Sequence, residues 1–175
     1  MDDISEYKDR LETVISNTVS NSTKLVHYLD RFFSDFYVII NYLIDYKGYS
    51  FSDLKKKYYF ISNIDSYSTL YSIVSTMLNY LVGLCSYLSR DSLKFYKNQY
   101  NRLSTLLSAL FTDFNEFKEF LISTLSKEEL DLLGSVINDM DSLLSLIEDI
   151  NKDFIDDINE LDSTISMISK YFSGR

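Results

Sequence analysis

The two side chain types best suited to metal or nucleophilic chemistry occur once each in this 175-residue sequence, as His27 and Cys85. A single histidine cannot build a zinc site from several histidines, and a di-iron bundle needs Glu-x-x-His motifs that this sequence lacks. Cys85 excludes an internal disulfide, and its apolar neighbours predict a small buried hydrophobe rather than a reactive thiol. We expect His27 to be structural or solvated.

Sequence motifs for cofactor chemistry are also missing. The chain has no P-loop, no dinucleotide-binding fingerprint and no Cys-x-x-Cys. Catalytic carboxylates can come together from distant parts of a fold, but long helices with tight turns leave few loops to build a pocket. We therefore expect no enzyme activity, no catalytic residues, no cofactor and no metal.

Charge is the most specific feature. Residues 127–175 hold 12 acidic and 4 basic side chains, a net charge of −8 against −9 for the whole chain. The acidic side chains of this last helix could simply keep an aromatic-rich protein soluble. It could instead dock a basic partner, such as a protein that normally grips nucleic acid. The acidic residues predicted to lie on or near one outer face are Asp149, Asp153, Asp156, Asp157 and Glu160.

Two basic clusters qualify this picture. One is the run from Lys55 to Lys57, followed by three aromatic residues, and the other lies around residues 90–102. Basic residues beside aromatics can bind single strands, yet the net charge disfavours direct nucleic-acid binding. We expect these clusters to pair with the acidic helix, within the chain or across a dimer. The second cluster comprises Arg90, Lys94, Lys97 and Arg102.

The elements that must position these residues follow from apolar periodicity. Apolar residues recur in alternating three- and four-residue steps, which is the pattern of one helix face. The phase slips near 17–22 and 62–66, where a helix could break. Gly48 suits a left-handed cap, and Ser126 with Glu129 forms a capping box. The predicted helices cover about 3–47, 51–89, 91–125 and 127–172.

The fold prediction is a single all-α domain over residues 1–175. There is no proline, and the connections are short, which favours antiparallel neighbours in an elongated up-down-up-down bundle with coiled-coil-like packing. Asn151 falls on a predicted core position, where a polar residue can fix register or oligomeric state, unless the stripe drifts and exposes it. The 15 tyrosines and 12 phenylalanines favour an interface, and we prefer a homodimer.

Residues 66–89 carry no charge and are long enough to span a bilayer. Their serines and their one-sided stripe favour a buried central helix over a membrane span. The acidic start of the chain is not a signal peptide, so we expect an intracellular protein, in a host cytoplasm or a virion. Heavy use of Ile, Asn, Lys and Tyr is typical of AT-rich coding sequences and suggests a viral or mobile-element origin.

Three functional hypotheses follow from these observations. The leading hypothesis is a non-enzymatic structural or protein-interaction protein that acts through long helical faces. The second is an inhibitor or decoy that binds a basic partner through the acidic last helix. The third is a membrane-associated component anchored through residues 66–89.

Overall fold

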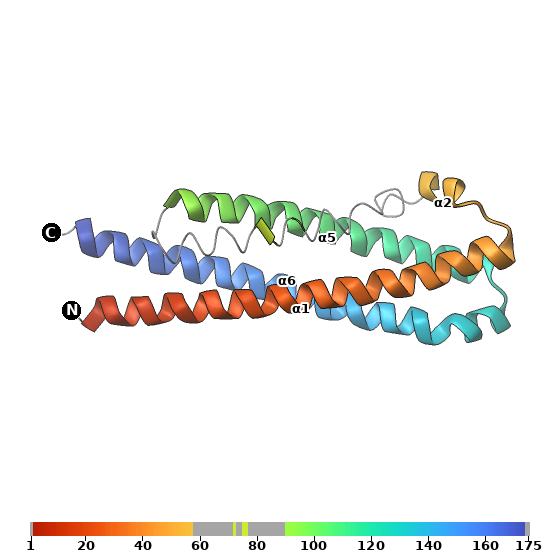
Figure 1. Cartoon of the computed structure of the whole chain (residues 1–175), viewed down its shortest axis with the longest axis horizontal. Helices are drawn as coiled ribbons and strands as arrows, with labels where there is room; N and C mark the ends of the chain where they lie inside the picture. The colour runs from red at the N-terminus through yellow and green to blue at the C-terminus, as the bar shows by residue number, and fades with distance from the viewer. Residues whose placement is uncertain (1, 58–71, 73–74, 77–89, 174–175) are drawn as a thin grey trace.

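The computed structural model describes residues 2–57, 72, 75–76 and 90–173, and no strand occurs among them (Figure 1). The all-α prediction is confirmed. The described ranges form three long helices and one short helix. These are α1 (Asp2–Lys47), α2 (Phe51–Lys57), α5 (Arg90–Thr124) and α6 (Lys127–Ser173).

The three long helices lie side by side along one axis (Figure 1). The two chain termini meet at one end, which we call the termini end. The α1–α2 connection and the α5–α6 turn meet at the other, which we call the turn end. Helix α6 therefore runs antiparallel to α1 and α5, and the predicted elongated antiparallel bundle is confirmed. With 46 and 47 residues, α1 and α6 are each about 70 Å long.

Helix α1 continues without a break through residues 17–22. Thr18 and Ser22 are fully buried there and occupy the core positions between Val14 and Leu25. Each hydroxyl donates a hydrogen bond to the carbonyl four residues earlier, at 2.9 Å for Thr18 and 2.8 Å for Ser22. The helical face is thus uninterrupted, and only its apolar character lapses for two positions.

Aromatic rings fill the core between α1 and α5. Phe32 packs edge-on against Phe114 with ring centroids 5.4 Å apart, and Phe36 packs against Phe117 at 5.5 Å. All four side chains are fully buried. One helical turn separates the pairs on each helix, so the two rows of rings hold α1 and α5 in register.

The helix ends match their sequence signals. Gly48 ends α1 with a φ of 76°, a left-handed conformation that glycine adopts without strain. Ser50 caps α2 by accepting the Asp53 amide at 3.1 Å. In the capping box of α6, the Glu129 amide donates to Ser126 Oγ at 3.1 Å. The Ser126 amide donates to Glu129 Oε1, also at 3.1 Å.

Several predicted features fall partly or wholly outside the described residues. Of the helix predicted over 51–89, the structure describes α2 and three further positions, so the break near 62–66, Cys85 and the uncharged stretch 66–89 lie mainly beyond it. Helix α5 already includes Arg90, one residue before its predicted start. Among the described helices, none combines the length and apolarity that crossing a membrane requires.

Candidate interaction surface

Helix α6 is tied to its neighbours by ion pairs that use its acidic side chains. Three of these pairs reach bases on α1 and two reach bases on α5. The charged groups of these pairs are half-exposed or exposed, so each pair contributes little stability. The pairs are Arg10–Glu160 at 2.6 Å, Arg31–Asp139 at 2.8 Å, Lys47–Glu129 at 3.0 Å, Lys97–Asp162 at 3.3 Å and Lys118–Asp141 at 2.7 Å.

An open groove of about 810 Å³ lies between the beginning of α1 and the C-terminal half of α6, toward the termini end. Five carboxylates and one guanidinium line it, so the groove is strongly acidic. Val14 supplies an apolar side chain among the polar ones. We call this the acidic groove, and its lining residues are Ser5, Glu6, Asp9, Arg10, Thr13, Val14, Asn17, Asp156, Asp157 and Glu160.

Arg10 is the only basic residue that lines the acidic groove. Its Nε and Nη2 atoms both donate to Oε1 of Glu160, at 2.9 and 2.6 Å. This hydrogen bond, followed by the charge of Glu160, raises the pKa of Arg10. The contact shows how a guanidinium engages this groove: it lies across the junction of α1 and α6 and satisfies one carboxylate while others remain open to solvent.

The structure separates the five acidic residues predicted to share one outer face. Asp149, Asp153 and Asp156 are exposed. Asp157 is half-buried and accepts a hydrogen bond from the Thr18 hydroxyl at 3.2 Å, while Glu160 is engaged by Arg10. Burial is the main cause that raises the pKa of Asp157. Of the five, Asp156, Asp157 and Glu160 line the groove, whereas Asp149 and Asp153 lie outside it.

The α1 side of the groove was missed at the sequence level. Glu6, Asp9 and Arg10 lie about 150 residues from their α6 neighbours in sequence, and no local motif marks them. The only available signal was the antiparallel pairing expected of the first and last helices, which brings their outer ends together.

Asn151 lies at the α5–α6 contact rather than in the centre of the core. It is half-buried, and the Tyr100 hydroxyl donates to its Oδ1 at 3.1 Å. Burial raises the pKa of the Tyr100 phenol. The pair links two helices of the same chain, and a role for Asn151 in register or oligomeric state stays a prediction.

A second polar group is buried at the centre of the bundle. The Tyr96 side chain is fully buried, and its hydroxyl faces the Thr18 side chain of α1 without a well-formed hydrogen bond. Burial raises the pKa of this phenol strongly, so Tyr96 stays protonated across the physiological range.

Two carboxyl groups, Asp35 of α1 and Asp139 of α6, face one another across the contact between these helices. The Asp35 Oδ2 atom is buried with no hydrogen-bond partner among the described residues. Burial, then the contact with Asp139 and its charge, raise the pKa of Asp35 from 3.8 to about 6, while Arg31 opposes the rise.

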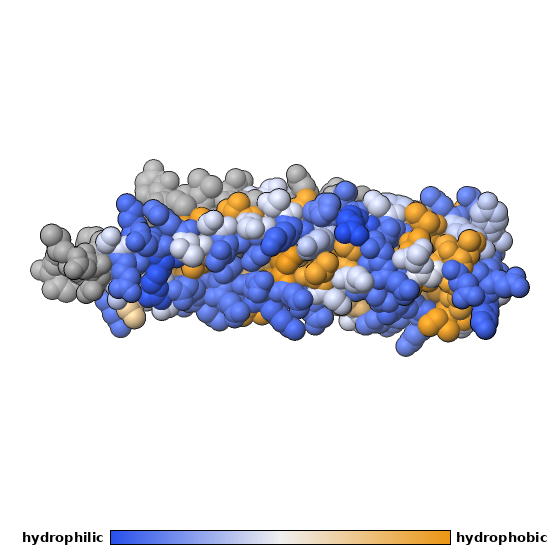
Figure 2. All heavy atoms as spheres, turned by 90° about the horizontal axis from the view of Figure 1, so that it is seen from below, coloured by the Kyte–Doolittle hydropathy of each residue, from blue (hydrophilic) through white to orange (hydrophobic). Residues whose placement is uncertain are grey.

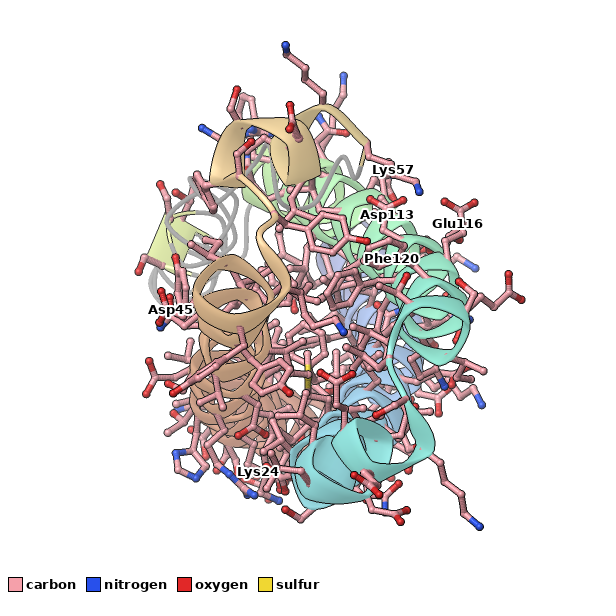
Figure 3. All side chains as sticks on the ribbon, turned by 90° about the vertical axis from the view of Figure 1, so that its right-hand side faces the viewer. Lys24, Asp45, Lys57, Asp113, Glu116 and Phe120 are labelled. Atoms are coloured by element: carbon pink, nitrogen blue, oxygen red, sulfur yellow. The ribbon has the colours of Figure 1, made fainter. Side chains whose placement is uncertain are left out.

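Some residues of the two basic clusters make contacts within the chain, and others are exposed to solvent. Lys97 pairs with Asp162 of α6, as expected for internal pairing, whereas Lys94 and Arg102 are exposed. At the turn end, Lys57 Nζ lies 4.7 Å from the centroid of the Phe120 ring. Figure 3, which views the bundle from that end, shows both residues on the same side of the molecule. Lys55 lies over Phe51 of its own helix, 5.3 Å from the ring centroid.

His27 is exposed on α1 beside Tyr28. No cluster of three or more potential metal ligands is found in the part of the chain that the structure describes. Comparison of the chain with family models, with curated proteins and with solved structures found no match.

Proposed function

We propose that this chain is a non-enzymatic protein-interaction protein whose long helical bundle binds a basic segment of a partner protein in the acidic groove. The observation that carries the proposal is the groove itself, where five carboxylates face one guanidinium. A groove lined by one sign of charge concentrates oppositely charged ligands and speeds their encounter.

The distribution of acids on α6 supports this reading. Its acids at the junctions with α1 and α5 are engaged in ion pairs inside the chain. Asp149, Asp153 and Asp156 are exposed and form no ion pair with a described residue. Solubility alone would be served by charges spread over the surface. The groove instead brings acids from two helices to one place, and Arg10 shows the hydrogen bonding that an incoming arginine would adopt.

A binding measurement tests the proposal directly. The fluorescence anisotropy of a labelled poly-arginine peptide is followed on titration with the full chain, with a poly-glutamate peptide as the reference of opposite charge. We expect binding of the basic peptide only, weakening steeply with salt because exposed charges are screened.

The key variant is Asp9→Lys/Asp156→Lys, which reverses two exposed groove carboxylates, one on each helix. Asp157 is left intact because it is half-buried and bonded to Thr18, so its reversal would disturb the fold. Binding should weaken at least about tenfold, which is about 1.4 kcal/mol. The matched control, Glu12→Lys/Glu148→Lys, makes the same charge change at exposed sites outside the groove. Equal losses in both variants would mean that net charge alone, and not the groove, governs binding.

A decoy role would direct the same groove at a nucleic-acid-binding protein, whose basic surface has the chemistry that poly-arginine supplies. We also propose an intracellular setting and, from the residue usage of the chain, a viral or mobile-element origin. Membrane association through residues 66–89 depends on residues outside those described.

A further inference from the structure

The partner chemistry that the acidic groove requires is present at the other end of the same molecule. Helix α2 has the sequence FSDLKKK, in which three lysines outnumber one acid. It lies at the turn end, whereas the acidic groove lies toward the termini end (Figure 1). The long axis of the bundle thus separates a basic helix from an acidic groove.

Helix α2 is held in place rather than loosely attached. Leu54 is 2 % exposed and anchors the helix to the core. Lys57 lies over the Phe120 ring of α5, and Tyr49 packs edge-on against the same ring with centroids 5.5 Å apart. Lys55 and Lys56 remain exposed on this fixed support. Little ordering entropy is therefore lost when a partner engages them.

The turn end also carries the most exposed large hydrophobic side chains of the described residues. Tyr46 is 75 % exposed, Leu132 is 68 % exposed and Ile122 is 67 % exposed. All three lie within a few residues of the α1–α2 connection or the α5–α6 turn. Figure 2 shows two hydrophobic patches on this mostly hydrophilic face, one toward the turn end and one near the middle of the bundle. Exposed apolar side chains gathered together, with polar residues around them, mark interaction surfaces.

We propose that the turn end of one copy, led by Lys55 and Lys56, docks at the acidic groove of a second copy. The inference rests on the proposed function of the groove and names its partner. Helix α2 is about 10 Å long, and the α1 side of the groove, from Ser5 to Asn17, extends about 18 Å. The short helix therefore fits along the groove.

This contact joins two different surfaces, so it is heterologous. A heterologous contact leaves one groove and one turn end unused in an open chain of copies, and such chains keep growing unless the rotation between copies closes a ring. The contact joins surfaces of opposite charge, so the assembly should weaken as salt is added. The reason is that the Debye length falls from about 10 Å at 0.1 M salt to about 3 Å at 1 M.

Sedimentation velocity of the full chain at low and high salt is the first test. At low salt we expect species heavier than the 20.5 kDa monomer, growing with protein concentration, and at 1 M salt we expect monomer. The turn-end variant Lys55→Glu/Lys56→Glu and the groove variant Asp9→Lys/Asp156→Lys should each be monomeric at both salts. The control Lys24→Glu/Lys152→Glu makes the same charge change at exposed sites on α1 and α6 and should assemble like the parent chain.

Mixing the two disabled variants gives the decisive result. The turn-end variant keeps an intact acidic groove, and the groove variant keeps an intact basic α2. Each variant therefore supplies the surface that the other has lost. The mixture should assemble although neither component does alone. A mixture that stays monomeric, or a parent chain that is monomeric at low salt, overturns the head-to-tail proposal. If poly-arginine still binds the parent chain in that case, the groove function stands and only the identity of the partner is wrong. If neither occurs, both proposals fail.

Discussion

Replacing Asp35 by asparagine should stabilise the protein at neutral pH. The folded state raises the pKa of this carboxyl from 3.8 to about 6, because Oδ2 is buried and Asp139 faces it from α6. At pH 7 the ionised Asp35 is therefore held close to a second carboxylate, with Arg31 only partly compensating. An asparagine removes the charge of this side chain, and its amide can donate a hydrogen bond to Asp139.

The sign of the pH dependence follows from linkage. The folded state binds the Asp35 proton more tightly than the unfolded state does, so this group favours folding at low pH. Its contribution is fully present below pH 3.8 and is lost as the pH rises through about 6. The difference between the two pKa values corresponds to about 3 kcal/mol, and solvent screening at this partly exposed carboxyl reduces the figure to about 1–1.5 kcal/mol.

Urea unfolding followed by circular dichroism measures this effect at pH 5 and pH 7.5. The free energy of unfolding of Asp35→Asn should exceed that of the parent chain by about 1–1.5 kcal/mol at pH 7.5 and by about half as much at pH 5, where only the unfolded-state carboxyl is mostly ionised. Asp45→Asn, at an exposed site near the end of α1, removes the same formal charge and serves as the control. The reasoning is refuted if Asp35→Asn is no more stable than the parent chain at pH 7.5, or if its advantage does not change with pH.

Three further predictions concern the fold. Ser126→Ala removes one half of the capping box and should lower the free energy of unfolding by about 1 kcal/mol, measured by urea titration, whereas an unchanged midpoint would show that the turn needs no cap. Phe36→Ala leaves a cavity in the aromatic core beside Phe117 and should lower the free energy of unfolding by about 3–5 kcal/mol. A loss below about 1 kcal/mol would contradict the packing described. Tyr96→Phe removes a buried hydroxyl that faces Thr18 without a well-formed hydrogen bond, so it should stabilise the fold slightly, by about 1 kcal/mol. A clear loss of stability on thermal unfolding would show instead that the contact with Thr18 stabilises the bundle.

Helix positions could be predicted because the core of a long bundle is repetitive. Each buried row on α5 and α6 recurs in steps of three and four residues, which the sequence displays directly. The same logic failed at residues 17–22, since Thr18 and Ser22 are buried polar residues at core positions. Their hydroxyls are satisfied by backbone carbonyls one turn earlier, so burial costs little, but hydrophobicity alone cannot reveal this.

The candidate site was predicted only in part. Neighbouring residues on a helix point about 100° apart, so Asp156 is exposed while Asp157 turns toward Thr18 of α1. An acidic run in the sequence cannot show which of its members are engaged by a neighbouring helix. That depends on the rotation of α6 against α1, which packing over many turns determines. The contribution of Glu6 and Asp9 likewise depends on how two helices distant in sequence are aligned.

The acidic side chains of α6 form ion pairs within the bundle and also line the proposed binding groove, and salt concentration can distinguish these two roles. The ion pairs to α1 and α5 are exposed or half-exposed, so they contribute little stability, while buried aromatic and aliphatic side chains supply most of it. Binding at the acidic groove has no comparable apolar core, because Val14 is the one aliphatic side chain among its lining residues. Raising the salt concentration should therefore abolish groove binding while the bundle remains folded. A bundle that unfolded over the same range of salt would instead assign the charge of α6 to holding the helices together.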